Sequence, residues 1–422
     1  MIRYLAVLVV FAISTVVFNF RTVKDLGAPR ACPPQVMREH WQALHGNDTS
    51  EFLRLLEESA NSLQHGRVYF PISDYDCPVT FLVPAGLVRL ATGWEPIVIL
   101  NLFFITSFFL SGLTAYWFFR TIGGQPYLSL LFAVFYQSAN FAFFAHHMGH
   151  MNSAQIQWIP LIFVAVVRML TDARARWVVL LGAGMGLQVL SSPSYTVYLF
   201  CAALPIFVLT YLVSRHRQSA EPLDYKRLAL RFSLAAVPAL LISGFYLAQR
   251  MGSMPHIYPP PTWLPFAFHD IRQLIDPTHS FLFIGLPLFV LLILSVHWWK
   301  SDREPMTTAI AFTLFAALIM MLPAVPGTPY WVLYKLNPLF HYLRVPTRFF
   351  PIFFLMLLAL ATLYLTKRSQ FHSKAHLRWI AAVLLLSQTV FCWFSSPWIM
   401  PVDAVGIAKQ LLGKSQGPAS VR

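Results

Sequence analysis

Charged residues are scarce in this chain of 422 residues: they make up 11% of it, where a soluble domain carries about 25%. Hydrophobic residues reach 57%, and the mean hydropathy is +0.59. This composition excludes an ordinary soluble domain. Apolar runs long enough to cross about 30 Å of hydrocarbon recur along the whole chain. We therefore expect an all-α, polytopic integral membrane protein whose surroundings are a lipid bilayer.

Cysteine is scarce as well, with four in the chain. Cys201 and Cys392 lie within apolar runs and are expected to be buried thiols. Cys32 and Cys77 both lie in the first long loop, where an oxidising compartment would allow them to pair. The sequence leaves a disulfide and two free thiols equally open.

Acidic residues are few beside basic ones, with 17 Asp and Glu against 31 Lys and Arg and a net charge of +14. An excess of this kind can indicate a nucleic-acid-binding protein. Here, however, the basic residues fall mostly in short connections between apolar runs, which is the pattern that sets membrane orientation. We therefore expect anionic lipid headgroups, and no nucleic acid, as the partners of these clusters.

About eleven transmembrane helices are predicted. The first run follows Arg3, has no small-x-small cleavage site after it, and is expected to be an uncleaved span. An N-terminus in the cytoplasm places 16 of the 31 basic residues on cytoplasmic connections and span ends, and none on two short outer connections. The N-terminus is therefore predicted to be cytoplasmic and the C-terminal tail outside. The predicted spans are residues 4–20, 97–119, 126–144, 154–170, 177–191, 193–213, 232–249, 281–298, 306–324, 349–366 and 379–396.

The predicted organisation is one transmembrane domain, residues 1–396, and a short outer tail, 397–422. Ser50 to Leu63 is expected to form an amphipathic helix in the first outer loop. Residues 81–94 are expected to form a short helix at the membrane surface. The break at Ser191–Ser194 predicts either a tight turn or a broken helix. The outer loops of real length are 21–78, 250–279 and 326–348.

The stretch HHMGHMNSAQIQWIPL gathers polar side chains between two apolar runs. His146 and His150 have the i, i+4 spacing of two zinc ligands on a helix, but a glycine lies between them and no HExxH glutamate follows. A wet loop at the membrane interface is the plain alternative. The functional alternative is a lip that binds a phosphate or headgroup through His146, His150, Asn152 and Gln157.

Two arginines flank a proline in LRVPTRFF, just before a predicted span. The guanidinium groups of Arg344 and Arg348 suit phosphate oxygens. The alternative is a pair of long side chains that reach the interface and anchor the span. Both interpretations stay open from the sequence.

Carboxylates of the first outer loop supply the candidate base. Asp48 lies in HGND, ahead of the expected loop helix, and Asp74 and Asp76 lie in SDYDCP. A carboxylate near the membrane surface can deprotonate a hydroxyl or bind a divalent cation such as Mg²⁺ or Mn²⁺. The alternative for each is a helix cap or a solvated loop charge.

Together these segments resemble the polytopic bacterial glycosyltransferases of the C-type (GT-C) superfamily, in particular its poorly characterised prokaryotic branches. The resemblance covers most of residues 1–366 and is carried by the first span, the long outer loop and its helix, NLFFITSFFLSGLTAYWFFRTIGG, HMGHMNSAQIQWIPL and LRVPTRFF. It implies an enzyme of the bacterial inner (plasma) membrane that transfers a sugar from a polyprenyl-phosphate donor to an envelope acceptor on the outer face.

The resemblance also implies roles for individual residues. Asp48 matches the essential acid of the first outer loop, which acts as base or metal ligand. The histidine and glutamine lip and the late arginines correspond to contacts with the carrier phosphate. The chain departs from the better-known members in lacking their plain DE or DD pair, and in having only residues 397–422 after the last span.

Two other functions are compatible with the same pattern. A transporter or flippase of lipid-linked sugars would use the cationic lip but need no base, and such proteins often show inverted repeats and broken helices. The chain has one Ser/Pro break and no obvious internal repeat. A non-catalytic membrane protein of envelope assembly is the third alternative. The pattern carries no indication of oligomeric state.

Overall fold

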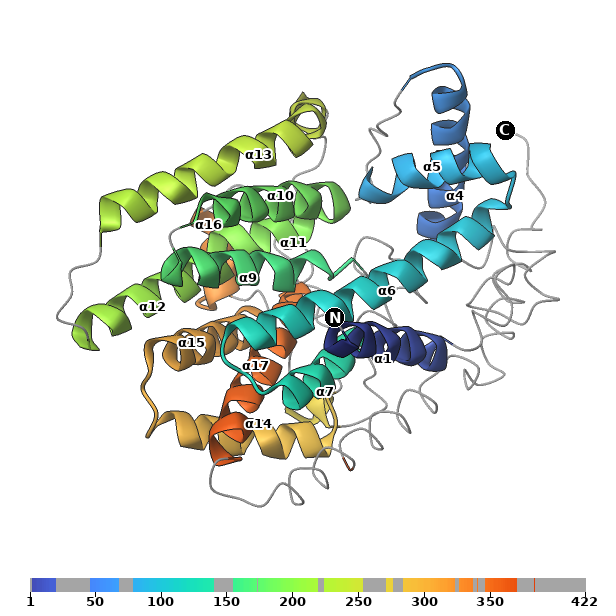
Figure 1. The fold of residues 1–422 in the computed structure, drawn as a ribbon. Coiled ribbons are helices and arrows are strands. Elements are labelled where there is room, and N and C mark those ends of the chain that lie inside the picture. The colour runs from blue at the N-terminus through green and yellow to red at the C-terminus, as the bar shows by residue number, and fades with distance from the viewer. Residues whose placement is uncertain are drawn as a thin grey trace, which may run out of the picture.

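The computed structural model describes residues 2–19, 46–67, 79–139, 155–172, 174–218, 224–252, 271–275, 284–322, 326–336, 340, 346–369 and 383 (Figure 1). Every regular element within these ranges is a helix, and they contain no strand, which confirms the expected all-α class there. The elements are α1 (Ile2–Phe18), α4 (Gly46–Gln64), α5 (Val79–Thr92), α6 (Pro96–Thr121), α7 (Pro126–Gln137), α9 (Trp158–Thr171), α10 (Ala175–Ser191), α11 (Pro193–Tyr198), η1 (Leu199–Ala203), α12 (Leu204–Gln218), α13 (Tyr225–Gly252), η3 (Ile271–Leu274), α14 (Leu286–Trp299), α15 (Pro305–Met320), α16 (Pro329–Leu336), η5 (Pro346–Phe349) and α17 (Phe350–Arg368).

Within the described ranges, four helical segments are long and apolar enough to cross a membrane: Val98–Thr121, Tyr195–Gln218, Tyr225–Ala248 and Pro346–Arg368. The other apolar helices are shorter, at 10–17 residues. The chain is therefore a helical membrane protein. Each of the first ten predicted spans contains helix, but the count of eleven crossings stays a prediction. The eleventh span, 379–396, lies outside the described residues apart from Val383.

Three helices begin at places that hydropathy did not predict. α9 begins at Trp158, four residues after the predicted start at 154. α13 begins at Tyr225 and not near residue 232, so Lys226, Arg227 and Arg231 lie on the helix and not in a connection. Long basic side chains can reach the headgroup level from a helical turn, so an apolar run starts later than the helix that contains it. α14 begins at Leu286, several residues after the predicted start. Its N-cap Gly285 has a φ of 83°, a conformation that favours glycine and ends the preceding segment.

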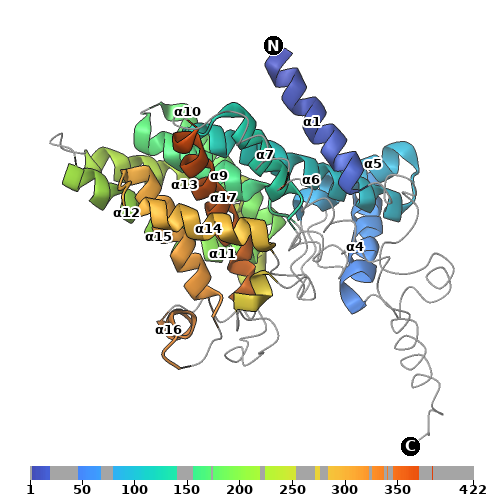
Figure 2. The same ribbon diagram turned by 90° about the horizontal axis from the view of Figure 1, so that it is seen from below.

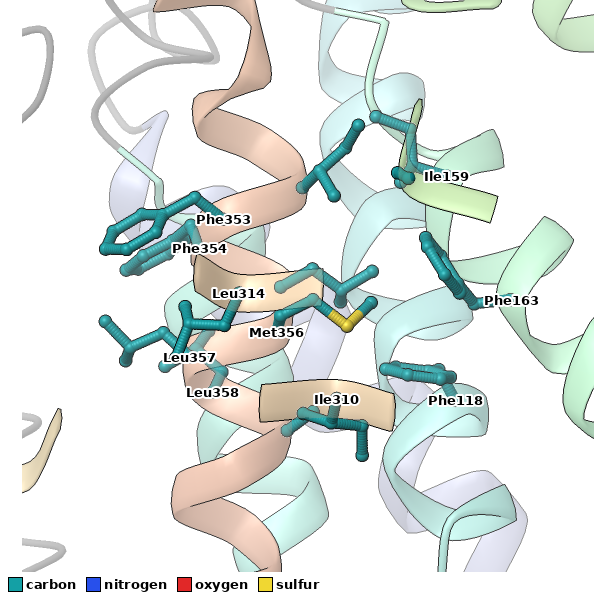
Figure 3. Close-up of a cluster of buried hydrophobic side chains, with 14 of the residues drawn as sticks. Phe118, Ile159, Phe163, Ile310, Leu314, Phe353, Phe354, Met356, Leu357 and Leu358 are labelled. Carbon is teal, nitrogen blue, oxygen red and sulfur yellow. The ribbon is translucent and has the colours of Figure 1, made fainter. Parts of the chain in front are cut away.

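α17 lies at the centre of the helical assembly. All residues from Phe350 to Leu363 are buried, so the helix has no lipid-facing side over that length. Figure 3 shows Met356 of α17 between Leu314 of α15 and the rings of Phe118 and Phe163. A helix that is apolar all round is one that other elements surround. The main core therefore forms around α17.

The break after α10 is a tight turn. Ser192 is extended, with φ −156° and ψ 93°, and Pro193 starts α11. Arg215, near the end of α12, donates a hydrogen bond to the carbonyl of Leu170 in the last turn of α9. The run α11–η1–α12 therefore returns to the end of the assembly where α9 ends, and α12 packs against α15 on the way. Within this run η1 is a π-helical turn.

The helix ends gather into two groups. At one end, which we call the basic end, Lys367 Nζ lies 2.7 Å from both Asp302 Oδ2 and Glu304 Oε1, and Gln218 bonds the carbonyl of Arg303. At the other, which we call the outer end after its predicted side, the hydroxyls of Thr80 and Ser191 lie 2.7 Å apart. Such grouping is what alternating crossings produce. The assignment of the basic end to the cytoplasm stays a prediction.

α10 and α13 pack closely through two glycines. A Cβ at Gly182 would lie 2.2 Å from Pro238 Cγ and 2.3 Å from the carbonyl oxygen of Ala235. A Cβ at Gly186 would lie 2.8 Å from Ile242 Cβ. Their spacing is the small-xxx-small pattern of close helix pairs in membranes. α13 is largely exposed elsewhere, so this contact holds it to the assembly.

We expect Gly182→Ala to destabilise the protein, because the methyl group would have to displace the α13 backbone. Overpacking of this kind costs about 1–3 kcal/mol. Thermal unfolding of the purified chain in detergent measures the effect as a lower melting temperature.

Gly244→Ala is the matched control. It lies on α13, gains the same helix propensity, and its new Cβ would meet only Leu240 Cβ at 3.9 Å. Equal melting temperatures for the two variants would contradict the close contact.

Candidate functional site

α4 brings the candidate acid Asp48 to the outer end. The helix begins at Gly46, so Asp48 lies in its first turn and not ahead of it as predicted. An acid in the first turn is stabilised by the partial positive charge of the helix N-terminus, which is a physical reason for the earlier start. The structure describes Asp48 as part of this helix backbone and shows nothing of its side chain.

α4 is fixed to the rest of the chain through an apolar face and a salt bridge. Leu55 and Leu56 are buried in a cluster with residues of α5 and of the first half of α6. Glu57 Oε1 lies 3.1 Å from Arg89 Nη2 of α5. Figure 1 shows α4 and α5 together at one end of α6. The amphipathic loop helix predicted at 50–63 is thus confirmed and is docked at the outer end.

Gln157 belongs to a buried polar network between α6 and the start of α9. The Ser107 hydroxyl donates to Gln157 Oε1 at 2.6 Å, and Gln157 Nε2 donates to Gln155 Oε1 at 2.8 Å. The Thr114 hydroxyl donates to the carbonyl of Gln157 at 2.9 Å. Both polar atoms of the Gln157 amide are therefore used within the protein. The bond to Gln155 uses one of the two N–H groups of this amide, and a contact of the amide with a carrier phosphate stays a prediction.

A second polar contact joins three helices at the same end. Trp158 Nε1 donates to the Ser191 hydroxyl at 2.8 Å, and this hydroxyl also bonds Thr80 of α5. Ser191 is the last residue of α10. α5, α9 and α10 are thus held together where the tight turn into α11 begins.

Arg348 lies in a cluster of aromatic residues between α11, α16 and η5. The rings of Tyr198 and Phe349 are 4.4 Å apart, and those of Tyr330 and Phe340 are 5.6 Å apart. Burial raises the pKa of the Tyr330 hydroxyl well above its usual value, and its hydrogen bond with Tyr198 acts in the same direction, whereas the Arg348 charge lowers the pKa. The Tyr330 hydroxyl is therefore a neutral hydrogen-bonding group beside a half-buried cation.

Among the residues that the structure describes, two polar side chains at this end are buried and have no hydrogen-bond partner. They are Gln188 of α10, through both amide atoms, and Thr347 of η5, through its hydroxyl. Buried polar groups are nearly always paired, so each of these indicates a position for a bound water or a polar ligand. Both lie close in sequence to residues of the outer end, Ser191 and Arg348.

The remaining predicted site residues lie outside the described part of the chain. Cys201 is half-buried and not fully buried as expected, whereas Cys392 lies with the undescribed residues. Within the described ranges no three His, Cys, Asp or Glu side chains come together as metal ligands. The Mg²⁺ or Mn²⁺ site stays a prediction, as does the pairing of the loop cysteines. The undescribed site residues are Asp74, Asp76, His146, His150, Asn152, Arg344, Cys32 and Cys77.

The sequence interpretation did not include the tyrosines of this end. Tyr195 and Tyr198 stand three residues apart in SSPSYTVY, directly after the break that was recognised, and both are fully buried. Two tyrosine hydroxyls on one helical face directly after a turn could have indicated a polar site at this end of the helix. Gln188 had no such signal, because an amide within an apolar run gives no indication of its partners.

No protein-family model matches the chain, and no curated protein matches it. The resemblance to GT-C glycosyltransferases therefore stays an expectation drawn from short motifs. What the chain does has to follow from its own residues and their geometry.

We expect Ser107→Ala to destabilise the outer end, because it leaves Gln157 Oε1 buried without its donor. The loss of one such bond costs about 1 kcal/mol. Thermal unfolding in detergent would show a lower melting temperature.

Thr106→Ala is the control at the neighbouring position. The Thr106 hydroxyl is exposed and bonds only the Leu102 carbonyl of its own helix. A Thr106→Ala variant as unstable as Ser107→Ala would refute a special role for the Gln157 network.

Proposed function

We propose that this protein is a membrane glycosyltransferase of the GT-C type, which transfers a sugar from a polyprenyl-phosphate donor to an envelope acceptor on the outer face of the bacterial inner membrane. Such a donor carries its phosphate at the headgroup level and its tail in hydrocarbon. The enzyme then needs a cation and hydrogen-bond donors at that level and a carboxylate on the same side.

The observation that carries the proposal is the half-buried Arg348 beside the buried hydroxyls of Tyr198 and Tyr330. This pair of neutral hydroxyls and a guanidinium suits a phosphate that leaves with negative charge. A series of contacts links it to the helix that carries Asp48: α11 follows Ser191, Ser191 bonds Thr80, and α5 packs against α4. The unpartnered Gln188 and Thr347 give further support for a polar ligand here.

In the proposed reaction Asp48 takes the proton from the acceptor hydroxyl. The acceptor oxygen forms a bond to C1 of the sugar while the bond between C1 and the phosphate oxygen breaks. The phosphate leaves with the electron pair of that bond, and Arg348 stabilises its charge.

We expect Asp48→Asn to reduce transfer of a labelled sugar by about 10²- to 10⁴-fold, the usual contribution of a positioned base. The assay uses the full chain in reconstituted membranes with polyprenyl-phosphate-linked sugars. Asp172→Asn, at the basic end, is the control, and its amide oxygen can still accept the bond from Trp177 Nε1. It should leave transfer unchanged.

Other outcomes separate the alternatives. Unchanged transfer by Asp48→Asn would move the base to Asp74 or Asp76. Absence of transfer by the unmodified protein, together with movement of the donor between leaflets, would overturn the transferase and favour a flippase.

We expect Arg348→Gln to raise the KM for the donor about tenfold or more, because a charge-assisted hydrogen bond to phosphate is lost. Steady-state kinetics with increasing donor would measure this. Arg217→Gln, an exposed change at the basic end, serves as control. Equal KM values for these two variants would exclude Arg348 from the donor site.

A further inference from the structure

A cavity of about 360 Å³ lies at the basic end, between α14 and α17. Its polar lining comes from His297, Lys300, Ser301 and Arg368. It lies at the opposite end of α17 from Arg348, because α17 begins directly after η5 and ends at Arg368. The cavity is therefore separate from the site of the proposed transfer reaction.

The cavity has positive charge that no described carboxylate neutralises. The acids nearest in sequence, Asp302 and Glu304, both bind Lys367 Nζ at 2.7 Å. No ion pair with Lys300 or Arg368 occurs among the described residues, and both side chains are exposed. The cavity therefore favours an anion.

Two aromatic rings form another part of the lining. The ring centroids of Trp298 and Tyr364 are 5.8 Å apart. The Arg368 guanidinium lies 5.8 Å from the centre of the Tyr364 ring, and Lys367 Nζ lies 5.5 Å from that of Trp298. Tyrosine and tryptophan are enriched at the level of lipid headgroups, because one side of the ring is apolar and the other polar. These rings place the cavity at that level.

An exposed apolar stripe on α14 leads to the cavity. Leu286, Val290 and Ile293 are 59%, 45% and 54% exposed, and Leu294, 45% exposed, lines the cavity itself. Their spacing of three or four residues puts them on one side of the helix. From Leu286 to His297 the stripe is about 16 Å long, at 1.5 Å per residue. It offers hydrocarbon contact directly beside the cationic cavity.

We propose that this cavity binds the headgroup phosphate of an anionic glycerophospholipid, whose acyl chain lies along the α14 stripe. Lys300 and Arg368 donate charge-assisted hydrogen bonds to the phosphate oxygens. Trp298 and Tyr364 contact the glycerol region. A free phosphate would use the cations alone and would leave the stripe without a role, which is why the lipid is the better occupant.

The test measures lipids that stay bound to the full chain, purified in neutral detergent, by native mass spectrometry. Phosphatidylglycerol and phosphatidylcholine with the same acyl chains are titrated separately. We expect phosphatidylglycerol to be retained preferentially. The double variant Lys300→Gln/Arg368→Gln should bind phosphatidylglycerol about 30-fold more weakly at low salt, since each basic group near an anionic headgroup contributes about fivefold. The control Arg217→Gln/Lys226→Gln, exposed at the same end, should bind as the unmodified protein does.

A second measurement does not depend on any variant. The preference of the unmodified protein for phosphatidylglycerol should weaken as salt rises from about 0.05 to 0.5 M, because salt screens exposed charges. Equal retention by the double variant and the unmodified protein would overturn the proposal. Displacement of the lipid by millimolar inorganic phosphate would also overturn it and indicate a free phosphate site. No sugar donor takes part, so failure here leaves the transferase proposal untouched, and the reverse holds too.

Discussion

The complete enclosure of α17 by its neighbours is the constraint on which the rest of the arrangement depends. A helix of 19 residues spans about 28 Å. Because none of its first 14 residues faces lipid, the helix cannot rotate or slide without disturbing α6, α7, α14 and α15 together. Packing of this kind, and not exclusion from water, holds helices together in a bilayer. The enclosure therefore sets the positions of Arg348, just before the helix, and Arg368, at its end.

The two ends of the assembly use different interactions. At the outer end most of the polar contacts join neutral side chains, such as Ser107 with Gln157 and Trp158 with Ser191, beside the one Glu57–Arg89 salt bridge described there. At the basic end charges dominate, through the Lys367 pairs and the cation–π contacts of Arg368. Neutral bonds keep their strength when salt changes, whereas exposed charge pairs weaken. The neutral bonds that hold α5, α6, α9 and α10 together at the outer end therefore depend less on ionic conditions than the proposed lipid site does.

Much of the fold could be predicted from the sequence, because a backbone in hydrocarbon has to satisfy its own hydrogen bonds and does so as helix. The apolar runs and the amphipathic α4 were predicted on this basis, and the break at Ser191–Ser194 was predicted as either a tight turn or a broken helix. The spacing of Gly182 and Gly186 in LLGAGMGLQ also indicates a close helix pair, but this contact was not predicted. The start of α4 was predicted too late, because an acid such as Asp48 is equally favourable as a helix cap and in the first helical turn.

The site was less predictable than the fold, because its contacts join residues far apart in the chain. Ser107 and Gln157 are 50 residues apart, and Thr80 and Ser191 are 111 apart. Hydropathy carries no information on which polar side chain meets which. Gln157 was predicted to be a site residue from its polar surroundings, and this stays a prediction. Its hydrogen bonds with Ser107 and Gln155 were not predicted.

The π-helical turn at Leu199–Ala203 separates the tyrosines of α11 from the apolar face of α12. A π turn holds about one residue more than an α turn, and one residue corresponds to about 100° of rotation. The directions in which Tyr198 and Phe207 point therefore differ from those in an uninterrupted α-helix, although the helical run that carries both is continuous. Removal of a single residue from the π turn would restore an α-helix and rotate α12 relative to α11. The number of residues in this segment therefore sets the angle between the two faces.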